Sequence, residues 1–187
     1  IRGEIYRTIT GAGIPLIEDD LYGDLYFNGH RPPSFIAEDV DDFGRGSDRG
    51  MVIHVGAFSK TLSPGYRVGW TRPGRWFEEV LKMKAATTLM SARPTQLVLA
   101  QFLAEGRYKR HMRSFKTKCR NQLATFSAHI HRTFPEGTRI SNPKGGFVLW
   151  VELPDTVDAL ELFNAAYKRG IGLAPGAMYS SQDRFKH

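Results

Sequence analysis

The sequence predicts an α/β fold, in which short strands alternate with helices. Short apolar runs bounded by glycine, proline or aspartate occur at residues 15–18, 51–55 and 68–71, as expected of buried strands. Helical spacing of apolar residues follows at 76–89 and again at 94–106. With 187 residues, of which 41% are hydrophobic and 12% aromatic, the chain can bury a sizeable core.

The N-terminal part is expected to contain one helix, one strand and a long connection. Residues 1–10 are typical of the end of a helix, which two glycines would close. The strand at 15–18 would end at Asp19-Asp20. Paired prolines and a run of acids and glycines in 31–50 predict a surface connection.

The middle of the chain adds two strands and two helices to this pattern. The β-branched run at 51–55 predicts the second strand, and 68–71 predicts a third, closed by Pro73-Gly74. The helix at 94–106 starts near Pro94, where proline suits the first turn, and ends at Gly106.

A long amphipathic helix is expected between Arg107 and Arg132. Apolar residues recur there at steps of three and four, on a stripe that continues one turn further: Tyr108, Met112, Phe115, Cys119, Leu123, Phe126, Ile130 and Phe134. The remaining face is basic and is expected to be solvated. Cys119 lies on the apolar stripe, which favours a buried core residue over a nucleophile.

The C-terminal part is expected to form a smaller domain. Residues 147–153 alternate as a strand, 158–169 predict a helix stopped by glycine, and 171–174 predict a last short strand. The change of composition near Arg107 predicts the boundary, so that the domains are 1–106 and 107–187.

Composition excludes several classes of function. No apolar run approaches the roughly 20 residues of a membrane span, and the N-terminus is not a signal peptide, so the chain is expected to begin inside a longer protein. One cysteine and the absence of zinc-ligand spacing favour a cytoplasmic protein without a metal site. The net charge of +7 is compatible with nucleic-acid binding, but the basic excess is better explained by the solvated face of the long helix.

The most informative residue is Lys60, which follows the strand at 51–55 in the sequence Gly-Ala-Phe-Ser-Lys-Thr-Leu-Ser-Pro-Gly-Tyr-Arg-Val-Gly. A lysine amine can form an imine, and a rigid guanidinium such as that of Arg67 can hold a phosphate. Pyridoxal 5'-phosphate (PLP) requires both groups. Ligands of open α/β sheets gather at the carboxyl ends of strands, where Asp19 and Lys60 both fall.

The stretch 59–69 resembles the lysine motif of fold-type I PLP-dependent aminotransferases of class I/II. Within them it is most similar to the aminotransferase-like domain of GntR/MocR-family transcription regulators and to kynurenine and 2-aminoadipate type aminotransferases. Residues 17–25 and 145–150 are further landmarks. The resemblance implies that 1–106 is the C-terminal part of the PLP-binding large domain, with a mainly parallel sheet and helices. Residues 107–187 would be the linking helix and most of a small α+β domain.

The resemblance also implies roles for single residues. Lys60 would form the Schiff base with PLP and then act as general acid and base. Asp19 would keep the pyridine nitrogen protonated, and Tyr22 would face the phenolic oxygen of the cofactor. A capping role for Asp19 and a packing role for Tyr22 are the alternatives.

Ser59 and Arg67 would hold the phosphate. The chain departs from the commoner family pattern at Ala57, where serine or threonine is usual, and loss of that hydrogen bond should weaken PLP binding by about 1 kcal/mol. Gly145 and Gly146 resemble the segment on the substrate side of the cleft, although a glycine turn entering a strand explains them equally well.

Two functions follow from the resemblance. The first is an aminotransferase that moves an amino group between an amino acid and a 2-oxo acid, with its active site near a homodimer interface. The alternative is a non-catalytic effector domain that senses PLP or an amino acid in a regulator that contacts DNA only through an upstream domain; residues 18–25 and the spacing of 61–69 resemble this branch more. An α/β domain without cofactor remains a third reading. A second phosphate loop and a ring-stacking aromatic are expected before Ile1, and a substrate-carboxylate arginine after His187, so the isolated chain is expected to be inactive.

Overall fold

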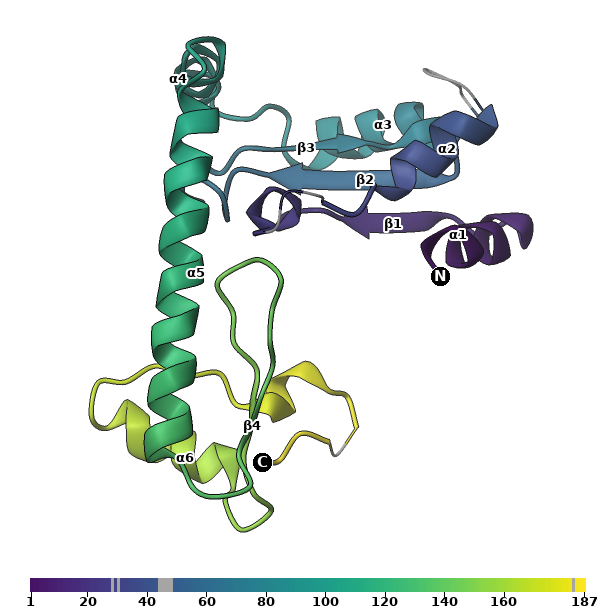
Figure 1. The fold of residues 1–187 in the computed structure, drawn as a ribbon. Helices are drawn as coiled ribbons and strands as arrows, with labels where there is room; N and C mark the ends of the chain where they lie inside the picture. Colours follow the sequence, from purple (N-terminus) through teal and green to yellow (C-terminus); the bar gives the residue numbers. More distant parts are fainter. Residues whose placement is uncertain (28, 30, 44–48, 183) are drawn as a thin grey trace. The chain divides into compact units, whose positions relative to one another are not determined.

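The computed structural model describes residues 1–27, 29, 31–43, 49–182 and 184–187 (Figure 1). Its contacts divide the chain into two compact units, Ile1–Lys116 and Thr117–His187. This division falls inside one long helix, whereas the predicted boundary falls at the first residue of the same helix.

The helices and strands are α1 (Arg2–Gly11), β1 (Leu16–Asp19), α2 (Phe35–Phe43), β2 (Val52–Ala57), β3 (Gly69–Arg72), α3 (Phe77–Thr87), α4 (Arg93–Ala104), α5 (Arg107–Thr133), β4 (Arg139–Ile140), β5 (Val151–Glu152) and α6 (Ala159–Tyr167). Short 3-10 turns lie at Gly23–Leu25, Pro64–Tyr66, Gly74–Trp76 and Gly176–Tyr179.

The first unit is built on a sheet with the strand order β1-β2-β3. β1 and β2 are parallel, with Asp19 opposite Val55, and the connection between them contains α2. β2 and β3 are antiparallel, with Ala57 opposite Gly69, because the loop that joins them is too short for a parallel crossover. The α/β class is therefore confirmed, while only one of the two strand pairs in this sheet is parallel.

A buried carboxylate joins α1, α2 and the residue before β2 in this unit. Asp39 of α2 is 4% exposed, and its Oδ1 accepts hydrogen bonds from the Tyr6 hydroxyl (3.2 Å) and the Met51 amide (2.8 Å). Burial and the neighbouring Asp39 carboxylate raise the pKa of Tyr6 above its usual value. Leu25 and Val52 are fully enclosed in the same core.

The prediction of a plain surface connection over 31–50 is wrong, since α2 occupies part of it. The helix begins where the Glu18 carboxylate accepts hydrogen bonds from the Phe35 amide at 3.0 Å through both oxygens. A carboxylate at a helix N-terminus satisfies an otherwise unpaired N–H group and complements the helix dipole. Residues 44–48 of the predicted connection lie outside the described residues.

The second unit contains the remainder of α5, one short hairpin and α6. Cys119 and Ile130 are each 7% exposed, which confirms the burial of the thiol, whereas Phe126 and Phe134 of the predicted apolar stripe are 54% and 40% exposed. Burial also raises the pKa of Cys119. Asp158 caps α6 by accepting hydrogen bonds from the amides of Leu160 (2.8 Å) and Glu161 (2.9 Å).

The strands predicted in this unit are mostly wrong. Only Val151–Glu152 of the predicted strand 147–153 pairs with β4, and 171–174 forms no strand within the described residues. Ile171 is 55% exposed and Leu173 is 37% exposed. Apolar alternation predicts a strand only where a neighbouring strand can pair with it, and none lies beside 171–174 in the described chain.

Candidate functional site

Lys60 lies in a loop whose two ends are fixed by backbone hydrogen bonds. The amide of Phe58 donates to the carbonyl of Val68 at 3.1 Å, which continues the β2–β3 ladder into the loop. The carbonyl of Phe58 in turn accepts hydrogen bonds from the amides of Leu62 (2.8 Å) and Ser63 (3.1 Å). The backbone therefore makes one tight turn around Ser59-Lys60.

The same loop turns back into β3 through a capped 3-10 turn. Ser63 accepts a hydrogen bond from the amide of Gly65 at 3.2 Å, and Pro64 occupies the first position of the turn. Arg67 ends it with φ 53°, in the left-handed region. A side chain there costs about 1 kcal/mol or more, so the surrounding hydrogen bonds must impose this conformation on Arg67.

A cavity of about 820 Å³ opens beside this loop. That volume is within the range of roughly 300–1,000 Å³ usual for small-molecule sites. Three of the lining residues are cationic, namely Lys60, Arg67 and Lys84, and none of the lining residues that the structure describes is acidic. The other residues that line it are Leu21, Val55, Gly56, Ala57, Ser59, Pro64, Val68, Gly69, Trp70, Thr71, Pro73, Phe77, Val80 and Leu81. Cations on largely apolar walls favour an anionic ligand.

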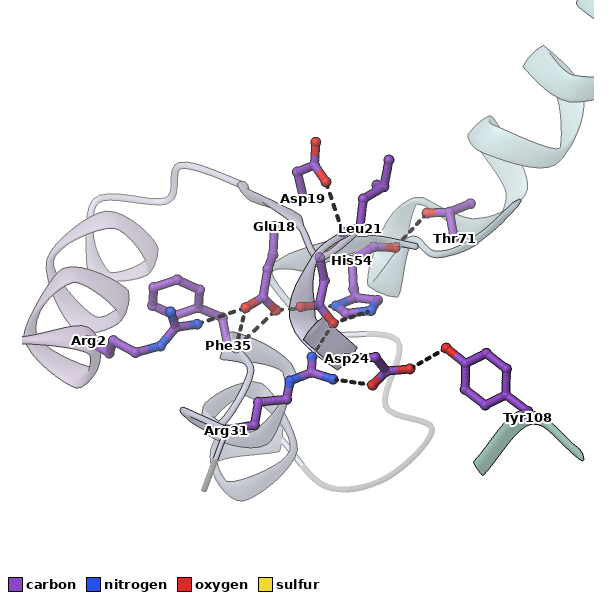
Figure 2. A network of polar contacts seen from close by, with 11 residues as sticks. Arg2, Glu18, Asp19, Leu21, Asp24, Arg31, Phe35, His54, Thr71 and Tyr108 are labelled. Carbon is purple, nitrogen blue, oxygen red and sulfur yellow. Dashed lines mark hydrogen bonds and ion pairs between the residues drawn. The ribbon is translucent and has the colours of Figure 1, made fainter. Parts of the chain in front are cut away.

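Two further predicted residues lie at the end of β1. The ring centroid of Tyr22 is 5.8 Å from Lys60 Nζ, within the range of a cation–π contact. Asp19 is exposed, and its Oδ1 accepts a hydrogen bond from the amide of Leu21 at 3.1 Å. Asp19 pairs in register with Val55, which lines the cavity. Figure 2 shows the Asp19 side chain on the opposite side of β1 from Glu18.

On the Glu18 side of β1, polar side chains form a connected network (Figure 2). His54 Nδ1 lies 3.3 Å from Glu18 Oε2, and His54 Nε2 lies 3.6 Å from Asp20 Oδ2. Arg31 pairs with Asp20 and also with Asp24, the latter at 3.3 Å. The carboxylates at 18 and 20 therefore serve the structure of this face, unlike Asp19 between them.

The network reaches α5 through Tyr108, whose hydroxyl donates to Asp24 Oδ2 at 2.7 Å. The pKa of Tyr108 is raised to about 12, mainly by burial and further by Asp24, while the nearby Thr61 hydroxyl acts in the opposite direction. The sequence pattern indicated Tyr108 only as an apolar stripe residue. The alternation of Glu18 and Asp20 around Asp19 could have indicated that this polar face exists.

Gly145 and Gly146 lie in the second unit. Gly146 is buried and has φ 77°, a conformation that favours glycine, and Gly145 is half-buried. This conformation accounts for a glycine at 146 without any ligand. Their part in a site with Lys60 therefore stays a prediction.

Neither a metal-ligand cluster nor a membrane-spanning helix occurs among the described residues. No group of three or more histidine, cysteine, aspartate or glutamate side chains is placed there to hold a metal ion. None of the helices in the described part of the chain combines the length and apolar character that a membrane span needs.

Comparison with known proteins gives matches over nearly the whole chain. The profile of a family described as aminotransferase class I and II matches residues 3–186. The uncharacterized HTH-type transcriptional regulator YjiR of Escherichia coli is 34% identical over 93% of this chain. The 2-aminoadipate transaminase of Thermus thermophilus is 29% identical over 95% of it. The chain spans only 35% and 44% of the lengths of these two relatives.

Solved structures agree with these sequence matches. LysN, an alpha-aminoadipate aminotransferase of Thermus thermophilus solved with N-(5'-phosphopyridoxyl)-L-leucine, superposes with a TM-score of 0.83 at 28% identity. The superposition covers 99% of this chain and 46% of the LysN chain. The kynurenine aminotransferase of Pyrococcus horikoshii superposes with a TM-score of 0.80 at 27% identity, over 94% of this chain and 42% of its own.

Proposed function

Because the chain belongs to the aminotransferase class I and II family, we propose that it forms part of a PLP-dependent aminotransferase. The protein would move an amino group between an amino acid and a 2-oxo acid. The observation that carries this proposal is the hydrogen-bonded loop whose residues Lys60, Ser59 and Arg67 line one cavity, with no acidic residue in the described part of its lining. The reaction itself is proposed by analogy with fold-type I aminotransferases, which this chain resembles in sequence and structure.

The residues of this cavity fit PLP in their chemistry. The cofactor carries an aldehyde that reacts with an amine, and a ring that withdraws electrons from a bound amino acid. Lys60 offers the amine, and Arg67 and Ser59 offer a guanidinium and a hydroxyl for the phosphate. Asp19, at the end of the neighbouring strand, would face the ring nitrogen.

The chain's own side chains would then hold and move protons. The Asp19 carboxylate would stabilise a proton on the ring nitrogen, because a negative charge nearby favours the protonated form. The Tyr22 ring centroid lies 5.8 Å from the amine of Lys60, and Tyr22 would place its hydroxyl beside the phenolic oxygen. Once the amine of the amino acid has replaced Lys60 on the cofactor, the freed Lys60 amine would act as the general base that takes the proton from the α-carbon.

The test of this assignment uses two lysines that line the same cavity. The full-length protein is incubated with PLP, reduced with borohydride, digested and analysed by mass spectrometry. We expect the cofactor on Lys60, loss of its absorbance band in Lys60→Ala, and a parent-like band in Lys84→Ala. Cofactor attached to Lys84 instead, or an unchanged band in Lys60→Ala, would overturn the assignment.

A second function is favoured by the similarity to an HTH-type transcriptional regulator. In that case the cavity would bind PLP or an amino acid as a signal, and an upstream domain would contact DNA. The same preparation separates the two functions when it is assayed with a panel of amino acids and 2-oxo acids. Turnover indicates the enzyme, and cofactor attachment without turnover indicates the regulator.

The remaining expectations are proposals about the full-length protein. We propose that 1–106 and 107–187 correspond to parts of the large and small domains, and that Gly145 and Gly146 face the substrate. We also propose a cytoplasmic homodimer without membrane contacts. Light scattering after size-exclusion chromatography would measure the subunit number.

A further inference from the structure

The backbone on both sides of Ser59-Lys60 is held by side chains from α5. The ring of Tyr108 meets the ring of Phe58 edge to face, with centroids 6.0 Å apart and planes at 83°. His111 Nε2 lies 2.7 Å from the carbonyl oxygen of Thr61. Tyr108 and His111 are three residues apart in α5 and therefore lie on the same face of the helix. One helix face thus contacts the residue before Ser59 and the residue after Lys60.

The contact to Thr61 completes the fixation of one peptide unit. The amide of Leu62 donates to the carbonyl of Phe58 at 2.8 Å, and the carbonyl of the same peptide unit, that of Thr61, bonds His111. Because a peptide unit is planar, bonds at both ends fix its orientation. Thr61 is 4% exposed, so its carbonyl lies in a region with little access to water.

The His111 ring is itself held in place by aromatic neighbours. It stacks on Phe115, with centroids 5.5 Å apart and planes at 19°, and it meets Phe102 at 6.5 Å and 69°. Since a carbonyl oxygen can only accept a hydrogen bond, Nε2 must carry the proton and donate it. The ring orientation and the tautomer of His111 are therefore both specified by the structure.

We propose that His111 is a positioning residue for Lys60. By donating to the Thr61 carbonyl it fixes the peptide unit between Thr61 and Leu62, one residue beyond Lys60, and so restricts the Cα from which the Lys60 amine reaches the cavity. The inference rests on the proposed function, in which Lys60 carries PLP. A lysine side chain has four rotatable bonds, so its amine reaches a cofactor reproducibly only when the backbone is fixed. Small displacements of a reacting group are costly, at roughly 100-fold in rate for about 1 Å.

The experiment compares two substitutions in the full-length protein. His111→Phe keeps an aromatic ring between Phe102 and Phe115 but has no donor, and His111→Gln keeps an N–H donor. We expect His111→Phe to weaken PLP binding about tenfold and to lower borohydride trapping at Lys60, as loss of one hydrogen bond to a buried carbonyl predicts. His111→Gln should restore most of both. The matched control is His129→Phe, because His129 is exposed and lies further along the same helix; this variant should behave as the parent.

Each outcome decides the proposal. Parent-like affinity and trapping in His111→Phe would overturn the positioning role while leaving the function of Lys60 intact. If circular dichroism shows that His111→Phe does not fold, His111→Gln alone carries the test. A folded Gln variant whose trapping at Lys60 is about tenfold or more below that of the parent would then overturn the proposal. A parent protein that attaches no cofactor at Lys60 would overturn the proposed function itself, and this inference with it.

Discussion

Adjacent residues at the end of β1 illustrate how strongly the face of a strand decides the role of a side chain. Asp19 and Asp20 are chemically identical, but successive side chains point to opposite faces of a sheet. Asp20 pairs with Arg31 and lies 3.6 Å from His54, while Asp19 contacts only a backbone amide in the described structure. The sequence motif did not predict the partners of Asp20, and the role of Asp19 toward a cofactor stays a prediction.

The pair allows a matched test of the proposed cofactor site. Asp19→Asn should leave the fold intact and slow the transfer half-reaction by several powers of ten, because a neutral amide no longer keeps the ring nitrogen protonated. Asp20→Asn should instead lower the melting temperature, because it removes a partner of Arg31. Single-turnover absorbance measurements and thermal unfolding of both variants separate these effects. A rate in Asp19→Asn within tenfold of the parent would show that another residue faces the nitrogen.

At the level of the elements, patterns that a segment carries within itself were predicted well. The helices α1, α3, α4, α5 and α6 all lie where apolar periodicity and terminal glycines indicated them. The failures concern partners elsewhere in the chain. α2 begins at the distant carboxylate of Glu18, and 171–174 lacks a neighbouring strand in the described residues. Periodicity contains no information on either partner.

The contact between α5 and the turn after β1 predicts a pH dependence of stability. The pKa of Tyr108 is raised by burial, then by Asp24, to about 12 in the folded protein, against an ordinary value of 10.0. Between these values the folded state keeps a proton that the unfolded state releases, so stability must fall as the pH rises through this window. The raised pKa of Tyr6 acts in the same direction.

Urea unfolding at about pH 8 and about pH 11 would measure this loss. Tyr108→Phe removes the titrating group, so the variant should lose less stability between the two pH values than the parent does. The absence of its hydrogen bond to Asp24 lowers stability equally at both and cancels in the comparison. Tyr167→Phe, whose side chain is 71% exposed, is the control and should lose as much as the parent. An unchanged loss in Tyr108→Phe would contradict the prediction.

For the whole molecule, local motifs specified the family and the lysine loop, but not the surroundings of the site. Lys60, Ser59 and Arg67 were predicted from one motif, and the structure places all three on one cavity. Lys84 and His111 were not predicted as parts of this region, since they come from α3 and α5 and approach the loop only in the folded chain. The left-handed backbone of Arg67 was likewise outside the reach of residue spacing.

Exposure of the site predicts how the isolated 187-residue chain behaves. Ile17 is 67% exposed and Tyr22 is 41% exposed, and Asp19 is also open to solvent. A carboxylate in water interacts weakly with a charged ring nitrogen, because the high dielectric constant screens the attraction. The chain also spans less than half the length of the relatives that it matches. We therefore expect the isolated chain to bind PLP weakly and to catalyse no amino transfer.

A titration of the isolated chain with PLP, followed by an assay of amino transfer from a panel of amino acids, tests this expectation. Lys60→Ala in the same chain is the control, because any weak binding that depends on the cavity should lose its covalent part. Turnover comparable to that of the full-length protein would show that these 187 residues suffice, and that solvent at Asp19 does not impair the chemistry.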